Sequence, residues 1–265
     1  MAEASAALEQ GAYTTFRTYG RDRILRLGQH LRRLEESLSL MIGLPAAPID
    51  DARARATVAA ALAFTGYAES RFRLTYGSRG LFVSVESFTP YESSLYANGV
   101  RCSTVTLHRT NPHAKSTTFI ASAAQAYKAL PAGVHEGLMV ADDGAILEGL
   151  SSNFFAVTTL PVGSEEIEGG VPVLRTEEAR VLIGVTRSLV LEVAAGVLPV
   201  TSVAVRYADL PRVTECFITS VSREILPVVQ IDERVVGDGK PGPITRELMR
   251  RFGDLVAREA ERIHA

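Results

Sequence analysis

The sequence predicts an α/β protein of mixed α+β type, with a small N-terminal part and a larger C-terminal part. Short runs that alternate apolar and polar residues, typical of strands, occur along most of the chain. Longer runs with apolar residues every three or four positions, typical of helices, interrupt them. A polar stretch with a proline, residues 108–114, is the predicted linker between the two parts.

The N-terminal part, residues 1–107, is predicted to be a small α+β domain of antiparallel strands with two helices. Gly77–Gly80 joins two expected strands as a hairpin. The second helix begins at Asp50 or Asp51 as capping residue and is rich in alanine. Residues 1–10 are expected to fray. The expected strands are residues 11–19, 23–27, 71–76, 81–86 and 100–107, and the expected helices are residues 29–42 and 51–65.

The C-terminal part, residues 115–265, is predicted to be the larger domain, in which short strands dominate and helices interrupt them. Gly163–Gly170 is expected to be an exposed acidic turn. The expected strands are residues 137–141, 145–148, 153–157, 171–175, 198–206, 215–220 and 227–231, and the expected helices are about residues 117–129, 184–195 and 241–262.

Composition favours a globular enzyme. The chain of 265 residues has 46% hydrophobic residues and a formal net charge of −2, which gives no electrostatic footprint for nucleic acid or an anionic membrane. No apolar run approaches the roughly 18–20 residues of a spanning helix, and the N-terminus lacks a signal-peptide core, so a cytoplasmic location is expected. Two cysteines are too few for a disulfide framework or a zinc site, and the histidines show no metal-ligand spacing.

Two features indicate chemistry between Lys115 and Asn153. Lys115 is one of only three lysines and follows Asn111-Pro112, whereas Lys128 and Lys240 are expected to be solvated. Glu148 ends a short apolar strand, where a buried and unpaired carboxylate would cost several kcal/mol, so it should face a cation or a cofactor.

A third feature is the segment Leu182-Ile-Gly-Val-Thr-Arg187, which precedes an apolar helical run. Free N–H groups and the dipole at a helix N-terminus attract phosphate. Gly184 allows close backbone approach, and Thr186 adds a hydroxyl.

Together, the lysine, the pattern E-G-x-x-x-N-F from Glu148 to Phe154, and this helix start resemble the class IV aminotransferases, the fold-type IV pyridoxal phosphate enzymes. That group includes branched-chain aminotransferases, D-amino-acid aminotransferases and aminodeoxychorismate lyases. The resemblance runs from about Gly11 to Arg246. It implies a small α+β domain and a larger barrel-like α/β domain bearing Lys115, with pyridoxal 5′-phosphate at their junction, and a homodimer.

The resemblance also implies roles for residues that would hold the cofactor. Lys115 would form the Schiff base, and Glu148, with Asn153, would face the pyridine nitrogen. Leu182, Gly184, Val185 and Thr186 match the family's phosphate-binding L-x-G-[IV]-T-R element.

Two further motifs are implied to bind the cofactor. Arg33 lies in a match to H-x-x-R-L-x-x-S, whose arginine reaches the phosphate from the small domain. Ser220, Val221 and Ser222 lie where the family has a small residue followed by threonine. Val221 cannot donate a side-chain hydrogen bond, so Ser220 or Ser222 is expected to compensate.

The substrate site departs more from the family. Tyr13 lies where relatives line the substrate pocket, and Tyr76 stands where some carry a carboxylate-binding arginine, for which Arg79 could substitute. Ile120 replaces the tyrosine that branched-chain enzymes have five positions after the lysine.

The function implied is transfer of an amino group between an amino acid and a 2-oxo acid. One alternative is an aminodeoxychorismate lyase, which eliminates pyruvate and gives 4-aminobenzoate. Thr14-Thr15 resembles that branch more than the branched-chain one. Another is a family member that binds pyridoxal phosphate but has little transaminase activity. The sequence does not select the amino acid or its L or D hand.

Overall fold

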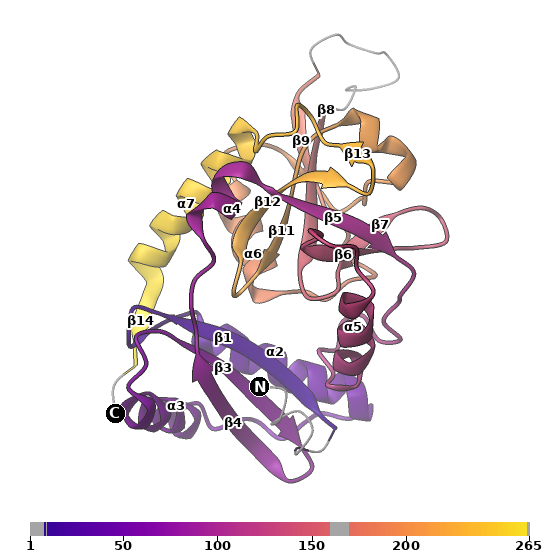
Figure 1. Cartoon of the computed structure of the whole chain (residues 1–265). Coiled ribbons are helices and arrows are strands. Elements are labelled where there is room, and N and C mark those ends of the chain that lie inside the picture. The colour runs from indigo at the N-terminus through magenta and orange to yellow at the C-terminus, as the bar shows by residue number, and fades with distance from the viewer. Residues whose placement is uncertain (1–7, 9, 160–169, 264–265) are drawn as a thin grey trace. The chain divides into compact units, whose positions relative to one another are not determined.

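A computed structural model of the chain describes residues 8, 10–159 and 170–263 (Figure 1). The predicted frayed terminus and the predicted acidic turn at 163–170 lie almost entirely outside the described residues. No helix among the described residues is long and apolar enough to cross a membrane.

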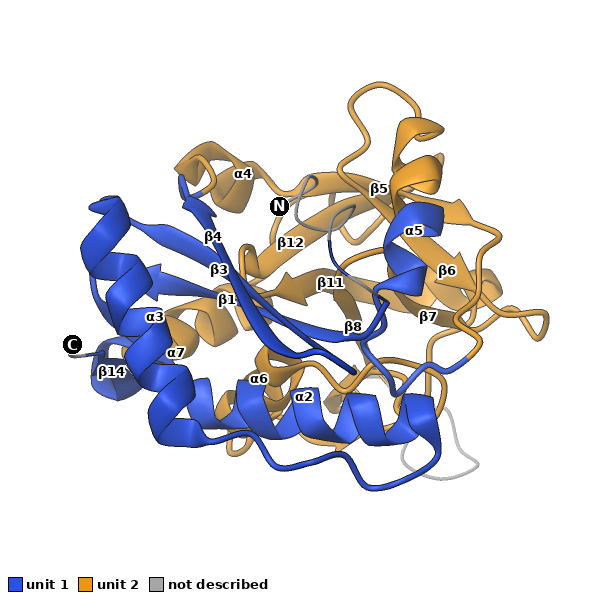
Figure 2. Ribbon diagram, turned by 90° about the horizontal axis from the view of Figure 1, so that it is seen from below, with its two compact units in different colours: residues 1–90, 111–122, 255–265 blue, residues 91–110, 123–254 orange. Residues whose placement is uncertain are grey.

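The chain forms two compact units, shown in different colours in Figure 2. The small unit contains residues 1–90, 111–122 and 255–265, and the barrel unit contains residues 91–110 and 123–254. This division by contacts differs from the predicted boundary at residues 108–114. Lys115, expected on the larger domain, lies in the small unit.

The small unit is built on one antiparallel sheet of five strands in the order β14-β2-β1-β3-β4. α2 packs against β1 and β3, and α3 contacts β4. Phe16 of β1 and Phe72 of β3 are cross-strand partners and stack with ring centroids 5.2 Å apart. The bounds are β1 Ala12–Tyr19, β2 Arg23–Leu25, α2 Leu27–Ile42, α3 Asp51–Thr65, β3 Ser70–Gly77, β4 Gly80–Ser87 and β14 Ala260–Arg262.

The side chains of β1 alternate between a buried face and a partly buried face of the small sheet. Ala12, Thr14 and Phe16 are completely or almost completely buried, whereas Tyr13 and Thr15, on the other face of the strand, are only partly buried. Since successive side chains of a strand point to opposite faces, a one-residue shift in register would exchange these two sets.

The barrel unit contains a nine-stranded sheet in which six strands, β8-β11-β12-β5-β6-β7, form a closed ring because β7 also pairs with β8. β9, β10 and β13 extend the sheet outside the ring. This confirms the predicted α/β class, with a small α+β part and a barrel-like larger part. The ring strands are β5 Val100–Val105, β6 Glu136–Val140, β7 Ile146–Gly149, β8 Asn153–Thr159, β11 Val213–Ser220 and β12 Glu224–Ile231.

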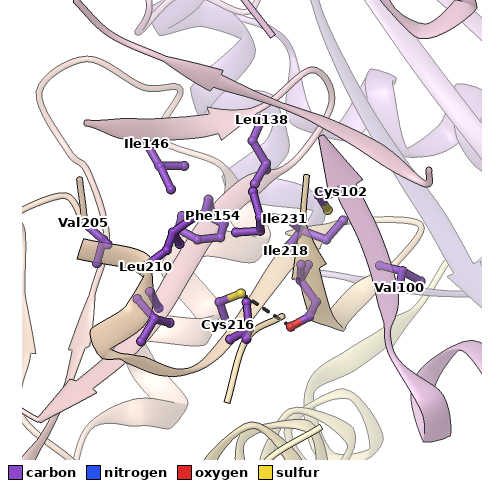
Figure 3. Close-up of a cluster of buried hydrophobic side chains, with 14 of the residues drawn as sticks. Val100, Cys102, Leu138, Ile146, Phe154, Val205, Leu210, Cys216, Ile218 and Ile231 are labelled. Atoms are coloured by element: carbon purple, nitrogen blue, oxygen red, sulfur yellow. Dashed lines mark hydrogen bonds between the residues drawn. The ribbon is translucent and has the colours of Figure 1, made fainter. Parts of the chain in front are cut away.

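One face of every ring strand contributes to a single apolar cluster (Figure 3). Strands from opposite sides of the ring share this cluster, so these side chains fill the barrel interior. The neighbouring residues in each strand therefore point outward. The cluster includes Val100, Cys102, Leu138, Ile146, Phe154, Ala156, Cys216, Ile218, Leu226 and Val228.

Most predicted elements are present, with shifts of a few residues at their ends. The remaining elements are α4 Ser93–Asn98, α5 Thr118–Lys128, β9 Pro172–Arg175, α6 Val185–Ala194, β10 Val200–Thr201, the 3-10 helix η1 Tyr207–Arg212, β13 Arg234–Val235 and α7 Pro243–Glu259.

Three predicted elements were assigned wrongly. The strand predicted at 100–107 is β5, which pairs in parallel with β12 and β6 in the barrel and does not belong to the small sheet. The strand predicted at 198–206 is only β10, followed by η1. The helix predicted at 241–262 ends at Glu259, after which β14 pairs with β2. In each case a hydrogen-bonding partner distant in sequence decides the outcome.

Candidate functional site

The predicted motif from Glu148 to Asn153 forms a buried polar centre in the barrel unit. Glu148 lies in β7 and Asn153 begins β8, where the two residues are cross-strand partners. Because Phe154 points into the barrel, its neighbour Asn153 points outward, and Glu148, as the cross-strand partner of Asn153, lies on the same face. Glu148 and Asn153 are only 2% and 6% exposed.

The Glu148 carboxylate accepts hydrogen bonds from Asn153, Leu182 and Arg109. Asn153 Nδ2 and the backbone N–H of Leu182 donate to Oε2, at 3.1 and 3.2 Å. Arg109 Nε donates to Oε1 at 2.8 Å, in an ion pair whose two side chains are 6% and 3% exposed. The arginine charge and the donors stabilise the ionised carboxylate.

Asn153 connects this carboxylate to the segment before α6. Its Nδ2 also donates to the Leu182 carbonyl at 2.7 Å. A Cβ added at Gly184 would lie 2.4 Å from Asn153 Oδ1, much closer than real Cβ atoms approach an oxygen. The glycine therefore allows the backbone to approach the asparagine.

The N-terminus of α6 offers a place for an anion. Gly184 is its N-cap, and no side chain caps the helix. Thr186, in the first turn, is 6% exposed. The buried Arg187 donates from Nη2 to the Glu177 carbonyl at 3.0 Å. Free N–H groups at the start of a helix attract phosphate oxygens.

A second group of hydroxyls lies at the end of β11. Thr219 is the cross-strand partner of Asn153, and its Oγ1 is buried without a hydrogen-bond partner among the described residues. Ser220 Oγ accepts from the backbone N–H of Arg223 at 3.3 Å. Val221 and Ser222 follow in the partly buried turn to β12. An unpartnered buried hydroxyl is costly unless a ligand completes it.

In the small unit, Lys115 lies against the N-terminal strand. Its carbonyl accepts from the backbone N–H of Tyr13 at 2.8 Å, and its N–H donates to Ser37 Oγ at 3.1 Å. The Lys115 Nζ is 4.8 Å from the centroid of the Tyr13 ring. The backbone of the lysine is thereby fixed, while its amine lies over a partly apolar surface.

Arg33 belongs to a buried relay in the same unit. Its Nη2 donates to Thr14 Oγ1 at 2.7 Å, and Thr14 Oγ1 lies 3.0 Å from His30 Nδ1. Since Thr14 accepts from the arginine, its single proton is available for His30 Nδ1. Burial, followed by the charges of Arg33 and Lys115, holds the pKa of His30 well below its usual value, so the ring is neutral. Burial also lowers the pKa of Arg33 to about 10.

The predicted substrate residues Tyr76 and Arg79 contact other groups of the small unit. Tyr76 donates its hydroxyl to the Ala47 carbonyl at 2.8 Å. The exposed Arg79 has its guanidinium 5.7 Å from the Phe82 ring centroid. Arg73, which the sequence did not indicate, has its guanidinium 5.2 Å from the centroid of the Tyr13 ring.

The structure thus brings together two sets of predicted residues, each within one unit. In the barrel unit Glu148, Asn153, Leu182 and Gly184 are in direct contact, and Arg109 joins them.

In the small unit Lys115 contacts Tyr13, and Arg33 reaches His30 through Thr14.

The sequence did not indicate Arg109 or Arg73, because Arg109 belongs to the predicted linker and the position of Arg73 near Tyr13 depends on the pairing of β1 with β3. Thr14 was noted only as part of Thr14-Thr15, and its contacts with Arg33 and His30 become visible only in the structure. Among the described residues, no group of three or more histidine, cysteine, aspartate or glutamate side chains could hold a metal ion.

Comparison with known proteins decides the family. Residues 11–231 match the sequence profile described as amino-transferase class IV. The chain belongs to the class IV aminotransferase family, whose enzymes depend on pyridoxal phosphate. This confirms the resemblance seen in the sequence.

Relatives include branched-chain-amino-acid and D-alanine aminotransferases. The chain is 30% identical to a branched-chain-amino-acid aminotransferase of Pseudomonas aeruginosa over 172 residues, which cover 61% of this chain and 51% of that protein. It is 31% identical to a D-alanine aminotransferase of Bacillus licheniformis over 133 residues, which cover 50% of this chain and 43% of that protein. The chain spans about half the length of these relatives.

The fold also matches solved structures. A hypothetical aminotransferase from Mycobacterium tuberculosis, in its pyridoxal phosphate-bound form, superposes with a TM-score of 0.74 at 24% sequence identity. The match covers 96% of this chain and 91% of that one.

Proposed function

We propose that this protein is a pyridoxal phosphate-dependent aminotransferase that moves an amino group between an amino acid and a 2-oxo acid. We assign Lys115 as the residue that bonds to the cofactor. The observation that best supports the proposal is the buried centre of Glu148, Asn153 and Gly184 beside an uncapped helix. It combines a stabilised carboxylate with an anion-attracting helix start in one polar centre.

The residues present fit this cofactor. The cofactor has a ring nitrogen, which makes the ring a stronger electron acceptor when it is protonated, and a phosphate that needs several hydrogen-bond donors. The barrel unit has a carboxylate for the first group. For the second it has the N–H groups of α6 and the unpartnered hydroxyl of Thr219. When bound, the cofactor supplies an aldehyde that condenses with amines and a ring that withdraws electrons from the substrate α-carbon.

Glu148 acts by holding a proton at the ring nitrogen. Its carboxylate must remain ionised while buried, and the Arg109 charge achieves this at a distance of 2.8 Å. Asn153 fixes the plane of the carboxylate through its amide. Without Arg109, the buried carboxylate would lose the only cationic donor among the three described above.

Phosphate binding is assigned to groups from several segments. The Val185 and Thr186 N–H groups and the Thr186 hydroxyl lie at the start of α6, and Ser220 or Ser222 can add hydroxyls from the turn after β11. Arg33 can add a guanidinium whose Nε is buried without a hydrogen-bond partner among the described residues. A guanidinium with unused donors suits phosphate.

Lys115 has the chemistry of both nucleophile and proton carrier. Its amine must be neutral to attack an aldehyde, and contact with the Tyr13 ring reduces its access to water. Once released, the same amine can move a proton to and from the substrate α-carbon. Tyr13 is assigned to the substrate pocket, with Tyr76 and Arg79 as weaker candidates.

Relatives act on branched-chain amino acids and on D-alanine, so both L- and D-amino acids are candidate substrates. The lyase that releases pyruvate and 4-aminobenzoate remains the alternative, because Thr14-Thr15 replaces the branched-chain pattern. A homodimer in the cytoplasm remains a prediction that sedimentation and cell fractionation would test.

One experiment tests the main proposal. Purified protein loaded with pyridoxal phosphate should show a yellow absorption band, and borohydride should fix the cofactor onto Lys115, as peptide mass spectrometry would detect. Lys115→Ala should abolish fixation, whereas Lys128→Ala, at an exposed position of α5, should not. A panel of L- and D-amino acids would identify the substrate that converts the band to the pyridoxamine form.

The outcomes separate the alternatives. Loss of the yellow band with either L- or D-amino acids, together with amino transfer to a 2-oxo acid, would establish transamination. A band that no amino acid bleaches, with 4-aminobenzoate formed from aminodeoxychorismate, would favour the lyase. A protein that takes up no pyridoxal phosphate would overturn the proposal.

A further inference from the structure

A second buried ion pair lies in the barrel unit, separate from the pair between Arg109 and Glu148. Glu136, the first residue of β6, is completely buried, and Arg223, in the turn between β11 and β12, is 8% exposed. Arg223 Nη1 lies 3.2 Å from Glu136 Oε2. Burying two charges is costly, so such a pair needs further hydrogen bonds to be tolerated.

The Glu136 carboxylate holds the segment that joins Glu148 to Asn153. Ser151 Oγ and Ser152 Oγ donate to Glu136 Oε2 at 3.2 and 3.0 Å. Glu136 therefore restrains the backbone between the two proposed cofactor residues, Glu148 and Asn153, through these two serines.

Gly149 belongs to the same arrangement. A Cβ added there would lie 2.2 Å from Ser152 Oγ and 2.9 Å from Glu136 Cγ. The glycine of the E-G motif thus leaves space for the carboxylate.

The Arg223 side chain contacts the same segment and connects it to other groups of the barrel unit. Its Nη1 donates to Ser151 Oγ at 2.9 Å, and Nη2 donates to the Tyr127 hydroxyl at 3.3 Å. Its Nε donates to His135 Nε2 at 3.4 Å. Burial, then Arg223, lowers the pKa of His135, which keeps the ring neutral and able to accept. Every guanidinium nitrogen therefore has a partner.

The backbone of Arg223 belongs to the other proposed cofactor segment. Its N–H donates to Ser220 Oγ at 3.3 Å, and the next residue, Glu224, has a φ of 54°, which marks a tight turn. One residue thus connects the hydroxyl turn at 220–222 with the segment at 149–152. Neither Arg223 nor Glu136 is among the residues assigned above to touch the cofactor.

We propose that Arg223 and Glu136 are a positioning pair, which fixes the 149–152 segment and the 220–222 turn relative to each other so that both are pre-arranged for the cofactor. The proposal rests on the proposed function. A pair that only stabilised the fold would change the melting temperature without changing cofactor affinity well below that temperature. A positioning pair must change the affinity itself.

The test is a titration of the cofactor-free protein with pyridoxal phosphate, followed by the visible band at 25 °C, alongside a melting curve. Arg223→Met should raise the Kd for pyridoxal phosphate at least tenfold, and Arg223→Lys, which keeps the charge beside Glu136, should recover part of the loss. Ser151→Ala, at an exposed position, should raise Kd severalfold with little change in Tm. Arg250→Met, which removes exposed ion pairs of α7, should change neither quantity.

Each result is decisive. If Arg223→Met does not fold, Ser151→Ala still tests the proposal, because it removes a single hydroxyl that connects the segment to Arg223, Glu136 and Tyr127. Wild-type uptake together with a Kd within twofold of wild type in the folded variants would overturn the positioning pair and leave the proposed function standing. No uptake by the wild type would overturn both.

Discussion

Replacing Arg109 by methionine should reveal how strongly the buried pair with Glu148 stabilises the barrel unit. Methionine keeps much of the volume of the side chain and removes its charge. The Glu148 carboxylate would stay buried with Asn153 Nδ2 and the Leu182 N–H as its remaining donors among the three described above. Breaking a buried pair typically costs about 3–5 kcal/mol. Since Asn153 Nδ2 and the Leu182 N–H continue to donate to the carboxylate, we expect a loss at the lower end of this range, about 3 kcal/mol.

The loss is measured as the free energy of unfolding in urea, with cofactor-free protein at pH 7.5. The chain contains no tryptophan, so far-UV circular dichroism follows the transition. Arg109→Met/Glu148→Gln should recover at least half of the loss, because no charge is then left unpaired. Arg250→Met is the control, since this arginine forms exposed ion pairs and its loss should not change the midpoint measurably.

Two results would refute the reasoning. A loss below about 1 kcal/mol in Arg109→Met would mean that the charge of Glu148 needs no arginine to remain buried. A double variant as unstable as the two single losses added together would mean that the residues do not interact energetically.

Three further changes have defined outcomes. Gly184→Ala should weaken pyridoxal phosphate binding at least tenfold and destabilise the protein by about 1–3 kcal/mol, because the new Cβ would clash with Asn153 Oδ1; titration and urea unfolding measure both. Because the pKa of His30 is lowered in the folded state, unfolded chains bind more protons, and the free energy of unfolding should fall as the pH drops below about 6.5, by at most about 1.4 kcal/mol per unit. His30→Gln should remove that part of the pH dependence. Thr14→Val should raise the Kd for pyridoxal phosphate severalfold, because Arg33 loses its acceptor.

Matched controls accompany these variants. Gly253→Ala on α7, where an added Cβ meets nothing within 4 Å, should be neutral or slightly stabilising. Thr15→Val changes the neighbouring residue on the opposite face of β1 and should leave cofactor affinity unchanged. A Gly184→Ala variant that binds like wild type would show that the backbone can move away from Asn153. An equal dependence of stability on pH in wild type and His30→Gln would exclude His30 as its source.

The sequence by itself determined the family, the mixed α/β class and the segments that contribute to the candidate site. Spaced motifs such as that from Glu148 to Asn153 are local, because strand, turn and strand follow one another within a few residues. Most helices and hairpins were predictable for the same reason, since their periodicity and turn residues act over short distances. The barrel-like form was implied by the resemblance rather than by any local pattern.

Only the tertiary structure decided which distant segments complete these motifs. β5 lies between β12 and β6, and β14 joins the small sheet, because hydrogen-bonding partners on other segments select the edge that each strand occupies. Arg109, placed by sequence in a linker, is paired with Glu148, and Arg223 is paired with Glu136 across 87 positions. A buried charge needs a counter-charge close to it in space, and the fold decides which residue supplies it. The number of residues between two charges in the sequence does not predict the distance between them in the structure.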